Sequence, residues 1–259
     1  MNSDEYWSDV ADSRADHIAY PLWRDYCDAL HARLLHRWLE GPHFHTTLKT
    51  DLFDEAHGQG MARALSAISD DVVGIDVSQS ITRRAAERHP GIEARTADVR
   101  QLPLDDGCID FVFSNSSLDH FEHAEDLHQS LREIHRVMAP DGRLLLTLDN
   151  PCNPVVGLRN KLPSSVFGKS ALLPYFVGHT LALAPLIHML DGMGFTIQRT
   201  GYILHVPRIV FLHLCRFFSP ETLGGRWLLR FMLAFDALAD LPTAPLTGHY
   251  VAVLARKKA

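Results

Sequence analysis

Three aspartates follow apolar segments at intervals that suit a ligand site. Asp54 follows the strand-like segment 46–53, Asp76 ends the run Val-Val-Gly-Ile-Asp, and Asp98 follows a short strand-like run at 92–96. A carboxylate just beyond a strand can accept two hydrogen bonds from a ribose diol or from an amine, each worth roughly 1.5–3 kcal/mol. Because open α/β sheets bind ligands at the carboxyl ends of their strands, we expect these acids to line one site.

Small residues follow the first of these acids, with Ala56, Gly58 and Gly60 in the sequence Asp-Glu-Ala-His-Gly-Gln-Gly. Such residues let the backbone approach a ligand closely, and the helix expected after them adds N–H donors for a carboxylate. A dinucleotide site needs GxGxxG, but Arg63 stands where the third glycine belongs, and no GxxxxGK[ST] occurs. The pattern favours a ligand with a ribose, an adenine and an amino-acid part; an NAD-dependent enzyme is the weaker alternative.

The elements that must position these residues alternate along the chain. Apolar periodicity predicts strands at 46–53, 72–75, 92–96, 109–113 and 144–148, and helices at 18–40, 80–89 and 127–138, with a turn at 140–143. This alternation predicts a parallel, doubly wound α/β sheet with helices on both faces. Lys49 and Asp51 are unusual inside a buried parallel strand, and a buried ion pair is one explanation.

The regular alternation of strands and helices ends at about residue 150. A helix is predicted at about 180–193, a strand at 195–205, further helices across 207–240 and a last strand at 248–254. We expect one domain over 1–259, with an N-terminal helical lid at 1–44, a cofactor-binding core at 45–150 and a substrate-side half at 151–259 whose helical insert covers about 207–240.

Composition narrows the function classes. The chain of 259 residues has a formal net charge of −6, which disfavours a general nucleic-acid-binding function. The sixteen histidines are scattered, no HExxH or zinc-type cluster occurs, and no metal site is expected. The four cysteines form no CxxC, which is typical of reduced thiols in the cytoplasm. No signal peptide is visible, and the most apolar stretch, 209–218, is far shorter than the ~20 residues of a membrane span.

Two longer segments complete an ordered set of motifs. Residues 102–114 read LPLDDGCIDFVFS, and residues 131–144 read LREIHRVMAPDGRL. Together with the three acids, they resemble the class I S-adenosylmethionine-dependent methyltransferases of the type 11 domain family, over about residues 45–150. The resemblance implies a Rossmann-like, seven-stranded, mostly parallel sheet and S-adenosyl-L-methionine as cofactor.

The resemblance also implies roles for individual residues. Asp54, Gly58 and Gly60 match the family's first motif, in which Ala56 replaces the first glycine. Asp76, with Val77, matches the ribose-binding position; Asp98 and Val99 match the adenine position; and Ser114 ends the fourth strand beside the cofactor. Each acid has a structural alternative: Asp54 as a helix cap, Asp76 as the N-cap of Asp-Val-Ser, and Asp98 as a turn residue.

The transfer itself needs alignment and desolvation, and it needs a base only when the nucleophile is a neutral group such as a hydroxyl. His120 is the candidate base, with Asp119 or Asp149 as its orienting partner; capping and packing are the alternative for Asp119 and His120. Asn115, Asn150 and Asn153 are candidate substrate ligands. Asn150 and Asn153 each stand directly before a proline, so a role in a turn explains them as well as substrate binding does.

Substrate recognition is expected from outside the common core. The aromatic residues Tyr6, Trp7, Tyr20 and Trp23 could fold over the cofactor as a lid or pack in the core. The insert at 207–240 could form a substrate roof, a homodimer interface, a lipid-facing surface or simply intramolecular helix packing. The leading interpretation is a cytoplasmic methyltransferase for a small molecule. The alternatives are a cyclisation or elimination that uses the same cofactor, and a non-catalytic cofactor-binding protein.

Overall fold

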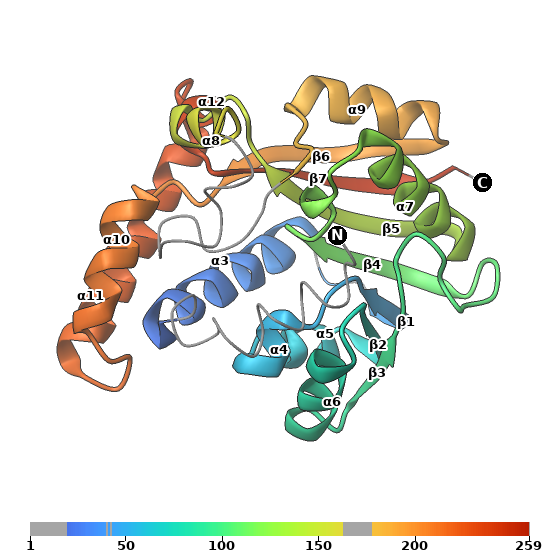
Figure 1. Cartoon of the computed structure of the whole chain (residues 1–259), viewed down its shortest axis with the longest axis horizontal. Coiled ribbons are helices and arrows are strands. Elements are labelled where there is room, and N and C mark those ends of the chain that lie inside the picture. The colour runs from blue at the N-terminus through green and yellow to red at the C-terminus, as the bar shows by residue number, and fades with distance from the viewer. Residues whose placement is uncertain (1–19, 40, 42, 163–177, 259) are drawn as a thin grey trace.

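A seven-stranded sheet forms the centre of the molecule (Figure 1). The computed structural model describes residues 20–39, 41, 43–162 and 178–258. The described strands run in the order β3-β2-β1-β4-β5-β7-β6; β7 runs antiparallel to β5 and β6 on either side of it, and the other neighbouring pairs are parallel. Their bounds are β1 Phe44–Lys49, β2 Ser69–Asp76, β3 Ile92–Thr96, β4 Ile109–Asn115, β5 Met138–Asp149, β6 Phe195–Ile203 and β7 Tyr250–Lys257. The predicted doubly wound, mostly parallel sheet is confirmed.

Helices connect the strands and cover both faces of the sheet. They are α3 Pro21–Leu39, α4 Phe53–His57, α5 Ala62–Ser66, α6 Gln79–Arg88, η1 Leu118–His120, α7 Ala124–Val137, α8 Pro154–Arg159, α9 Leu183–Gly192, α10 Arg208–Leu214, η3 Cys215–Phe217, α11 Leu223–Ala234, η4 Phe235–Asp240 and α12 Ala244–Thr247. The helix predicted at 18–40 is therefore α3, and the insert predicted at 207–240 is the run from α10 to η4.

Side-chain alternation along the strands builds one apolar core on each face. On β2, for example, Val72 belongs to the core under α3, α5 and α6, whereas Val73 and Ile75 belong to the core under α7 and α9. Figure 1 shows α7 and α9 on one side of the sheet and α3 with α4 on the other. Because both faces are covered, the carboxyl ends of the parallel strands remain as the place where polar side chains can meet.

The first strand ends earlier than the sequence indicates. The apolar pattern suggests a strand over 46–53, but β1 ends at Lys49 and a helix, α4, already begins at Phe53. Leu52 and Phe53, which prolonged the apolar pattern, belong to the turn and the helix instead. The residues at the tip of β1 are therefore Thr50 and Asp51, and Asp54 lies one turn further along the chain.

Lys49 is explained by a buried ion-pair cluster. Its side chain is fully buried, and its Nζ lies 3.0 Å from Oε2 of the fully buried Glu55 and 3.3 Å from Oδ2 of Asp51. Burial opposes the charge of Lys49, but the carboxylates of Asp51 and Glu55 outweigh it and raise the pKa of Lys49. The pair that the sequence suggested is present, and Glu55 is its second, unexpected partner.

The predicted turn at 140–143 and the predicted N-terminal lid also need comment. The turn predicted at 140–143 is an irregularity within β5, where Asp141 has a φ of +64° and the pairing with β4 shifts register. Tyr6 and Trp7 lie outside the described residues, and of the four aromatic residues predicted for a lid the structure describes Tyr20 and Trp23. No helix in the described part of the chain is long and apolar enough to cross a membrane.

Candidate functional site

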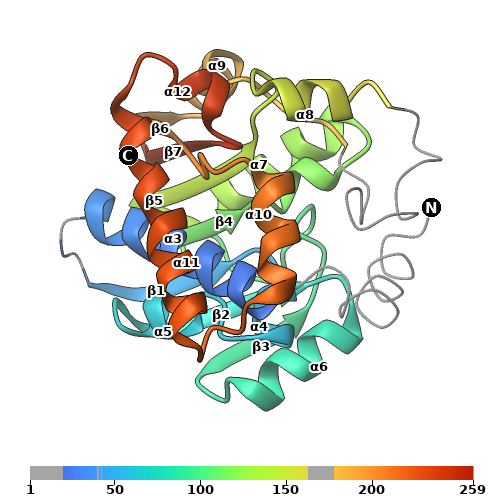
Figure 2. The ribbon, with the colours of Figure 1, turned by 90° about the vertical axis from the view of Figure 1, so that its left-hand side faces the viewer.

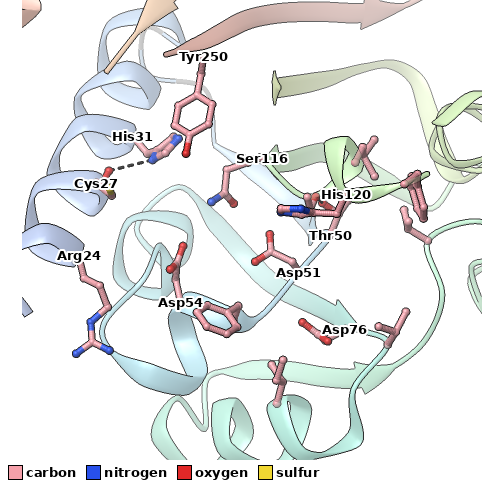
Figure 3. Close-up of a pocket in the computed structure, with 18 of the residues that line it drawn as sticks. Arg24, Cys27, His31, Thr50, Asp51, Asp54, Asp76, Ser116, His120 and Tyr250 are labelled. Carbon is pink, nitrogen blue, oxygen red and sulfur yellow. Dashed lines mark hydrogen bonds between the residues drawn. The ribbon is translucent and has the colours of Figure 1, made fainter. Parts of the chain in front are cut away.

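A cavity of about 220 Å³ opens at the carboxyl ends of β1, β2 and β4. The loops after these strands form its floor, α3 forms one wall, and Arg208 and Leu212 of α10 also line it. Figure 3 shows His31 and Tyr250 on one side and the carboxylates of Asp51, Asp54 and Asp76 on the other. The cavity therefore lies where the series of strand-tip acids predicts a ligand.

Asp76 is held rigidly at the tip of β2. Its Oδ2 accepts a hydrogen bond from the backbone N–H of Leu52 at 3.1 Å, and its Oδ1 accepts one from Ser78 at 2.9 Å. Burial raises the pKa of Asp76 to about 7, although these two bonds oppose the shift. Ser78, and not Asp76, is the side-chain cap of α6, because its Oγ accepts from the N–H of Ile81. The carboxylate of Asp76 is thus available to a ligand in the cavity.

Acidic side chains are concentrated around this floor. Asp51 and Asp54 line the cavity beside Asp76. Burial raises the pKa of Asp51 against the pull of Lys49, and burial together with the nearby Asp54 raises the pKa of Asp28, on α3, to about 8. Crowded, partly desolvated carboxylates are stabilised by an added positive charge. The floor is therefore electrostatically suited to a cationic ligand.

Asp98 is already engaged by a neighbouring arginine. Its carboxylate lies 2.7 Å from Nη2 of Arg100 and accepts the backbone N–H of Arg100 at 2.8 Å. Although partial burial opposes it, this pairing lowers the pKa of Asp98. Arg100 also bonds to Asp126 and lies over the ring of Phe121 at 5.3 Å. Asp98 and Val99 both line the cavity, so Asp98 lies at its predicted place as an ionised, structured turn residue.

The predicted small residues lie apart from the cavity. Ala56, Gly58 and Gly60 are not among the residues that line it, because the early end of β1 places them within or after α4. Gly60 has another reason to be glycine. Its φ is +52°, and a Cβ there would collide with the carboxylate of Glu55, whose Oε1 accepts the N–H of Met61 at 2.7 Å. The glycine thus makes room for the buried ion-pair cluster.

His31 of α3 is a site residue that the sequence did not suggest. Its Nδ1 lies 2.9 Å from the carbonyl oxygen of Cys27 and must donate there, which leaves the lone pair of Nε2 free to accept. That Nε2 is buried and has no hydrogen-bond partner among the described residues. Burial lowers the pKa of His31 to about 4, so the ring is neutral near pH 7. A neutral imidazole therefore presents an unused acceptor to the cavity.

Other groups surround His31 on this side. Tyr250, at the start of β7, lies with its ring centroid 6.4 Å from that of His31, and its hydroxyl points into the cavity in Figure 3. Arg208 extends over the ring of Trp23 at 6.0 Å, and both residues line the cavity. His120, from η1, lines the opposite wall. This half of the site combines aromatic rings with donors and acceptors for a polar group.

Asp119 and Asp149 lie behind this wall and do not line the cavity. Asp119 is fully buried; its Oδ2 accepts the N–H of Asp149 at 2.7 Å, and its Oδ1 is 3.8 Å from Nε2 of His120. Burial and the neighbouring Asp149 raise the pKa of Asp119.

Asp149 belongs to a buried chain of polar groups that ends at the cavity. Its Oδ2 lies 2.6 Å from Arg159 and its Oδ1 lies 3.4 Å from Nε2 of His249, which in turn lies 2.6 Å from Nη1 of Arg208. Despite the opposing effect of burial, His249 and Arg159 lower the pKa of Asp149. Asp149 thus helps to position Arg208 and has no direct access to a ligand.

The asparagines separate into two kinds. Asn115 lines the cavity, and its buried Oδ1 has no hydrogen-bond partner in the described part of the chain. Asn150 donates to the carbonyls of Pro245 and Gly248, whereas Asn153 caps α8 through the N–H of Val155. The latter two therefore act as turn formers. Ser114 is buried below the floor, where its hydroxyl accepts from Thr50 at 2.9 Å.

The residues that sequence reasoning missed share a pattern. Arg24, Cys27 and His31 recur at positions i, i+3 and i+7 of α3 and all line the cavity. That spacing places them on one helix face, next to the apolar residues that identified the helix. Polar residues on the buried side of an otherwise amphipathic helix were the signal that could have located them.

One segment of the chain matches a known type of domain. Residues 56–146 match the family model described as a methyltransferase domain. The chain carries a class I S-adenosylmethionine-dependent methyltransferase domain. The cofactor of this methyltransferase domain is S-adenosyl-L-methionine, and the matched residues include the acids at the tips of β2 and β3.

Curated relatives support the same family. The chain is 26% identical over 162 residues to a probable S-adenosylmethionine-dependent methyltransferase of Mycolicibacterium smegmatis, covering 62% of this chain and 58% of the relative. It is 31% identical over 151 residues to a malonyl-[acyl-carrier protein] O-methyltransferase of Halorhodospira halophila, covering 55% of this chain and 46% of the relative. The chain thus spans about half the length of these relatives.

A solved structure shows the same fold. The N-methyltransferase NodS from Bradyrhizobium japonicum, crystallised with S-adenosyl-L-homocysteine, superposes with a TM-score of 0.59 at 12% identity, and 100% of each chain is covered. At this identity the likeness concerns the fold alone.

The residues of the cavity fit this cofactor. S-adenosylmethionine carries two positive groups, a sulfonium and an ammonium, and the floor offers the carboxylates of Asp51, Asp54 and Asp76. Aliphatic Val77 and Val99, which flank the tips of β2 and β3, supply apolar surface for an adenine. The fit therefore depends on carboxylates and apolar side chains, without a glycine-rich loop directly after β1.

Proposed function

We propose that this chain transfers a methyl group from S-adenosylmethionine to a small-molecule acceptor in the cytoplasm. The observation that carries the proposal is the single cavity in which Asp76, Asp98 and Asn115 at successive strand tips meet the neutral His31. Free thiols at the four cysteines accord with a reducing compartment. We extend the proposal to the division of the chain into a lid at 1–44, a core at 45–150 and a substrate-side half at 151–259.

The floor of the cavity is the proposed cofactor half. Asp76 accepts hydrogen bonds from the ribose hydroxyls, while Asp98, Val77 and Val99 border the adenine. Asp51 and Asp54 bind the ammonium group. In this arrangement Ala56, Gly58, Gly60 and Ser114 support the loop from behind and do not contact the cofactor.

The opposite wall is the proposed acceptor half. When bound, the cofactor supplies a methyl group on a positively charged sulfur, which becomes neutral after transfer. Nε2 of His31 accepts the proton that a hydroxyl or amine acceptor loses. Its protonation then leaves the total charge of the cavity unchanged, which offsets the burial that otherwise disfavours imidazolium. Tyr250, Arg208 and Asn115 orient the polar part of the acceptor.

Product analysis tests the proposed reaction. The purified chain is incubated with S-adenosylmethionine and a fractionated metabolite extract, and the products are identified by mass spectrometry. We expect S-adenosylhomocysteine together with an acceptor whose mass has increased by one methylene group. Methylthioadenosine in its place would support the alternative, a cyclisation or elimination. No detectable cofactor binding at millimolar ligand, weaker than about −4 kcal/mol, would exclude both enzymatic readings.

Removal of the imidazole separates catalysis from binding. We expect His31→Phe to lower the rate of S-adenosylhomocysteine formation about a hundredfold or more, because a positioned base contributes roughly 10²–10⁴-fold. Calorimetry should show unchanged cofactor affinity, since His31 lies on the acceptor side. His120→Phe is the matched control on the other wall. If His120→Phe abolished turnover and His31→Phe did not, the base would be His120, the first candidate from the sequence.

The affinity for S-adenosylhomocysteine is expected to depend on pH through Asp76. The ribose hydroxyls donate, so the ionised carboxylate is the binding form, and burial raises the pKa of Asp76 to about 7. Affinity should therefore be full above about pH 8 and fall below pH 7, approaching tenfold per pH unit. Calorimetry between pH 8 and pH 6 measures this. An Asp76→Asn variant, which cannot titrate there, should lose the dependence; an unchanged slope in that variant would assign it to another group.

A further inference from the structure

The outer face of α10, η3 and α11 exposes many large apolar side chains. Figure 2 looks onto these helices, which lie in front of α3. Their exposed fractions range from 47% to 69% for six residues: Ile209, Val210, Phe217, Leu223, Trp227 and Phe231. Large exposed apolar patches of this kind mark interaction sites. We name this set of six residues the apolar face.

The inner sides of the same helices are already used. Met232 and Leu233 of α11 are buried in the core that also contains α3, and Leu212 of α10 lines the cavity. Leu223, Trp227 and Phe231 recur every four residues and therefore share the opposite, outward side of α11. One whole side of α11 is therefore apolar and exposed, and no other element in the described part of the chain covers it.

The charge of this segment has the opposite sign to that of the chain. Residues 208–234 contain four arginines, at 208, 216, 226 and 230, and one glutamate, at 221, which gives a net charge of +3. The whole chain has a formal net charge of −6. The guanidinium of Arg230 lies 5.6 Å from the ring centroid of Trp227, so positive charge and aromatic surface occur together. Of the four arginines, Arg216, Arg226 and Arg230 are exposed, whereas Arg208 lines the cavity and does not belong to the outer face.

We propose that the apolar face and its arginines dock the protein onto the surface of an anionic lipid bilayer. Helices that lie in the membrane interface combine Trp, Phe and Leu on one side with Arg or Lys, and the cations add attraction to acidic headgroups. A second copy of this chain is a poorer occupant. In a two-fold dimer the same surface meets itself, so arginines would face arginines. The docking does not depend on the proposed transfer reaction.

Vesicle cosedimentation with the full chain tests the docking. We expect binding to vesicles of phosphatidylcholine mixed with phosphatidylglycerol, little binding to phosphatidylcholine alone, and loss of binding at high salt. Trp227→Ser combined with Phe231→Ser should weaken the binding about tenfold or more. Arg226→Glu combined with Arg230→Glu should do the same, and it serves as the independent test if the first variant fails to fold.

The control variant reverses two positive charges at a site far from the apolar face. Arg256 and Lys258 lie near the carboxyl end of β7, away from α10 and α11 in Figure 1. Arg256→Glu combined with Lys258→Glu should leave vesicle binding unchanged. The proposal is overturned if acidic vesicles are not bound, if this control loses binding as strongly as the arginine pair of α11, or if both vesicle types bind equally. It is also overturned if sedimentation shows a dimer that the Trp227 and Phe231 changes dissociate.

Discussion

Asp76→Ala is expected to weaken S-adenosylhomocysteine binding about a hundredfold or more at pH 8. The variant would remove the two charge-assisted hydrogen bonds that we propose Asp76 makes to the ribose, each worth roughly 1.5–3 kcal/mol. It also removes the hydrogen bonds that Asp76 accepts from the N–H groups of Leu52 and Ser78, at 3.1 and 2.9 Å. The loops that form the floor of the cavity then lose the contact that holds them together. Isothermal titration calorimetry with S-adenosylhomocysteine measures the change.

The same strand offers a matched control. Asp71 is an exposed aspartate near the amino end of β2, at the opposite edge of the sheet from the cavity. Asp71→Ala should leave the affinity unchanged. Thermal unfolding of both variants separates a binding defect from a folding defect. An affinity of folded Asp76→Ala equal to that of the parent would remove Asp76 from the cofactor site.

Lys49→Met is expected to destabilise the fold by about 3–5 kcal/mol, the largest stability effect that we predict. The change leaves the fully buried carboxylate of Glu55 without its partner at 3.0 Å, and an unpaired buried charge is costly. Urea denaturation followed by circular dichroism measures the free energy of unfolding, provided that the transition is two-state.

The double variant Lys49→Met with Glu55→Gln tests the mechanism. A glutamine at position 55 has a neutral carbonyl that can still accept the N–H of Met61, as Oε1 of Glu55 does now. We expect the double variant to recover most of the lost stability, because it removes both charges together. Equal stability losses in the single and double variants would show that the side-chain packing of Lys49, and not its charge, is what matters.

Several site residues were predictable because they lie where a strand ends. Asp76, Val77, Asp98, Val99 and Asn115 all line the cavity, at the tips of β2, β3 and β4. Their places follow from strand periodicity and from the rule that parallel strands end at one edge.

The first strand shows why the residues predicted for the floor of the cavity differ from those observed there. Apolar Leu52 and Phe53 continue the strand-like pattern, yet the chain turns after Lys49 and begins a helix. A short apolar run fits a buried strand or a buried turn equally well, because periodicity reports burial and not backbone direction. The displacement moves Thr50 and Asp51 to the cavity and takes Gly58 and Gly60 away from it.

The sequence by itself determined the doubly wound sheet, the methyltransferase family and the acids that follow the second and third strands. The sheet and the acids depend on local periodicity and on residues at strand ends, which are close in sequence, whereas the family was identified from the resemblance of the ordered motifs. Only the tertiary structure decided that His31 of α3 and Tyr250 of β7, more than two hundred residues apart, face one cavity. It also decided that Asp149 and Asn150 lie behind it. Long-range packing sets which side of a helix or loop meets the cavity, and no local pattern records that contact.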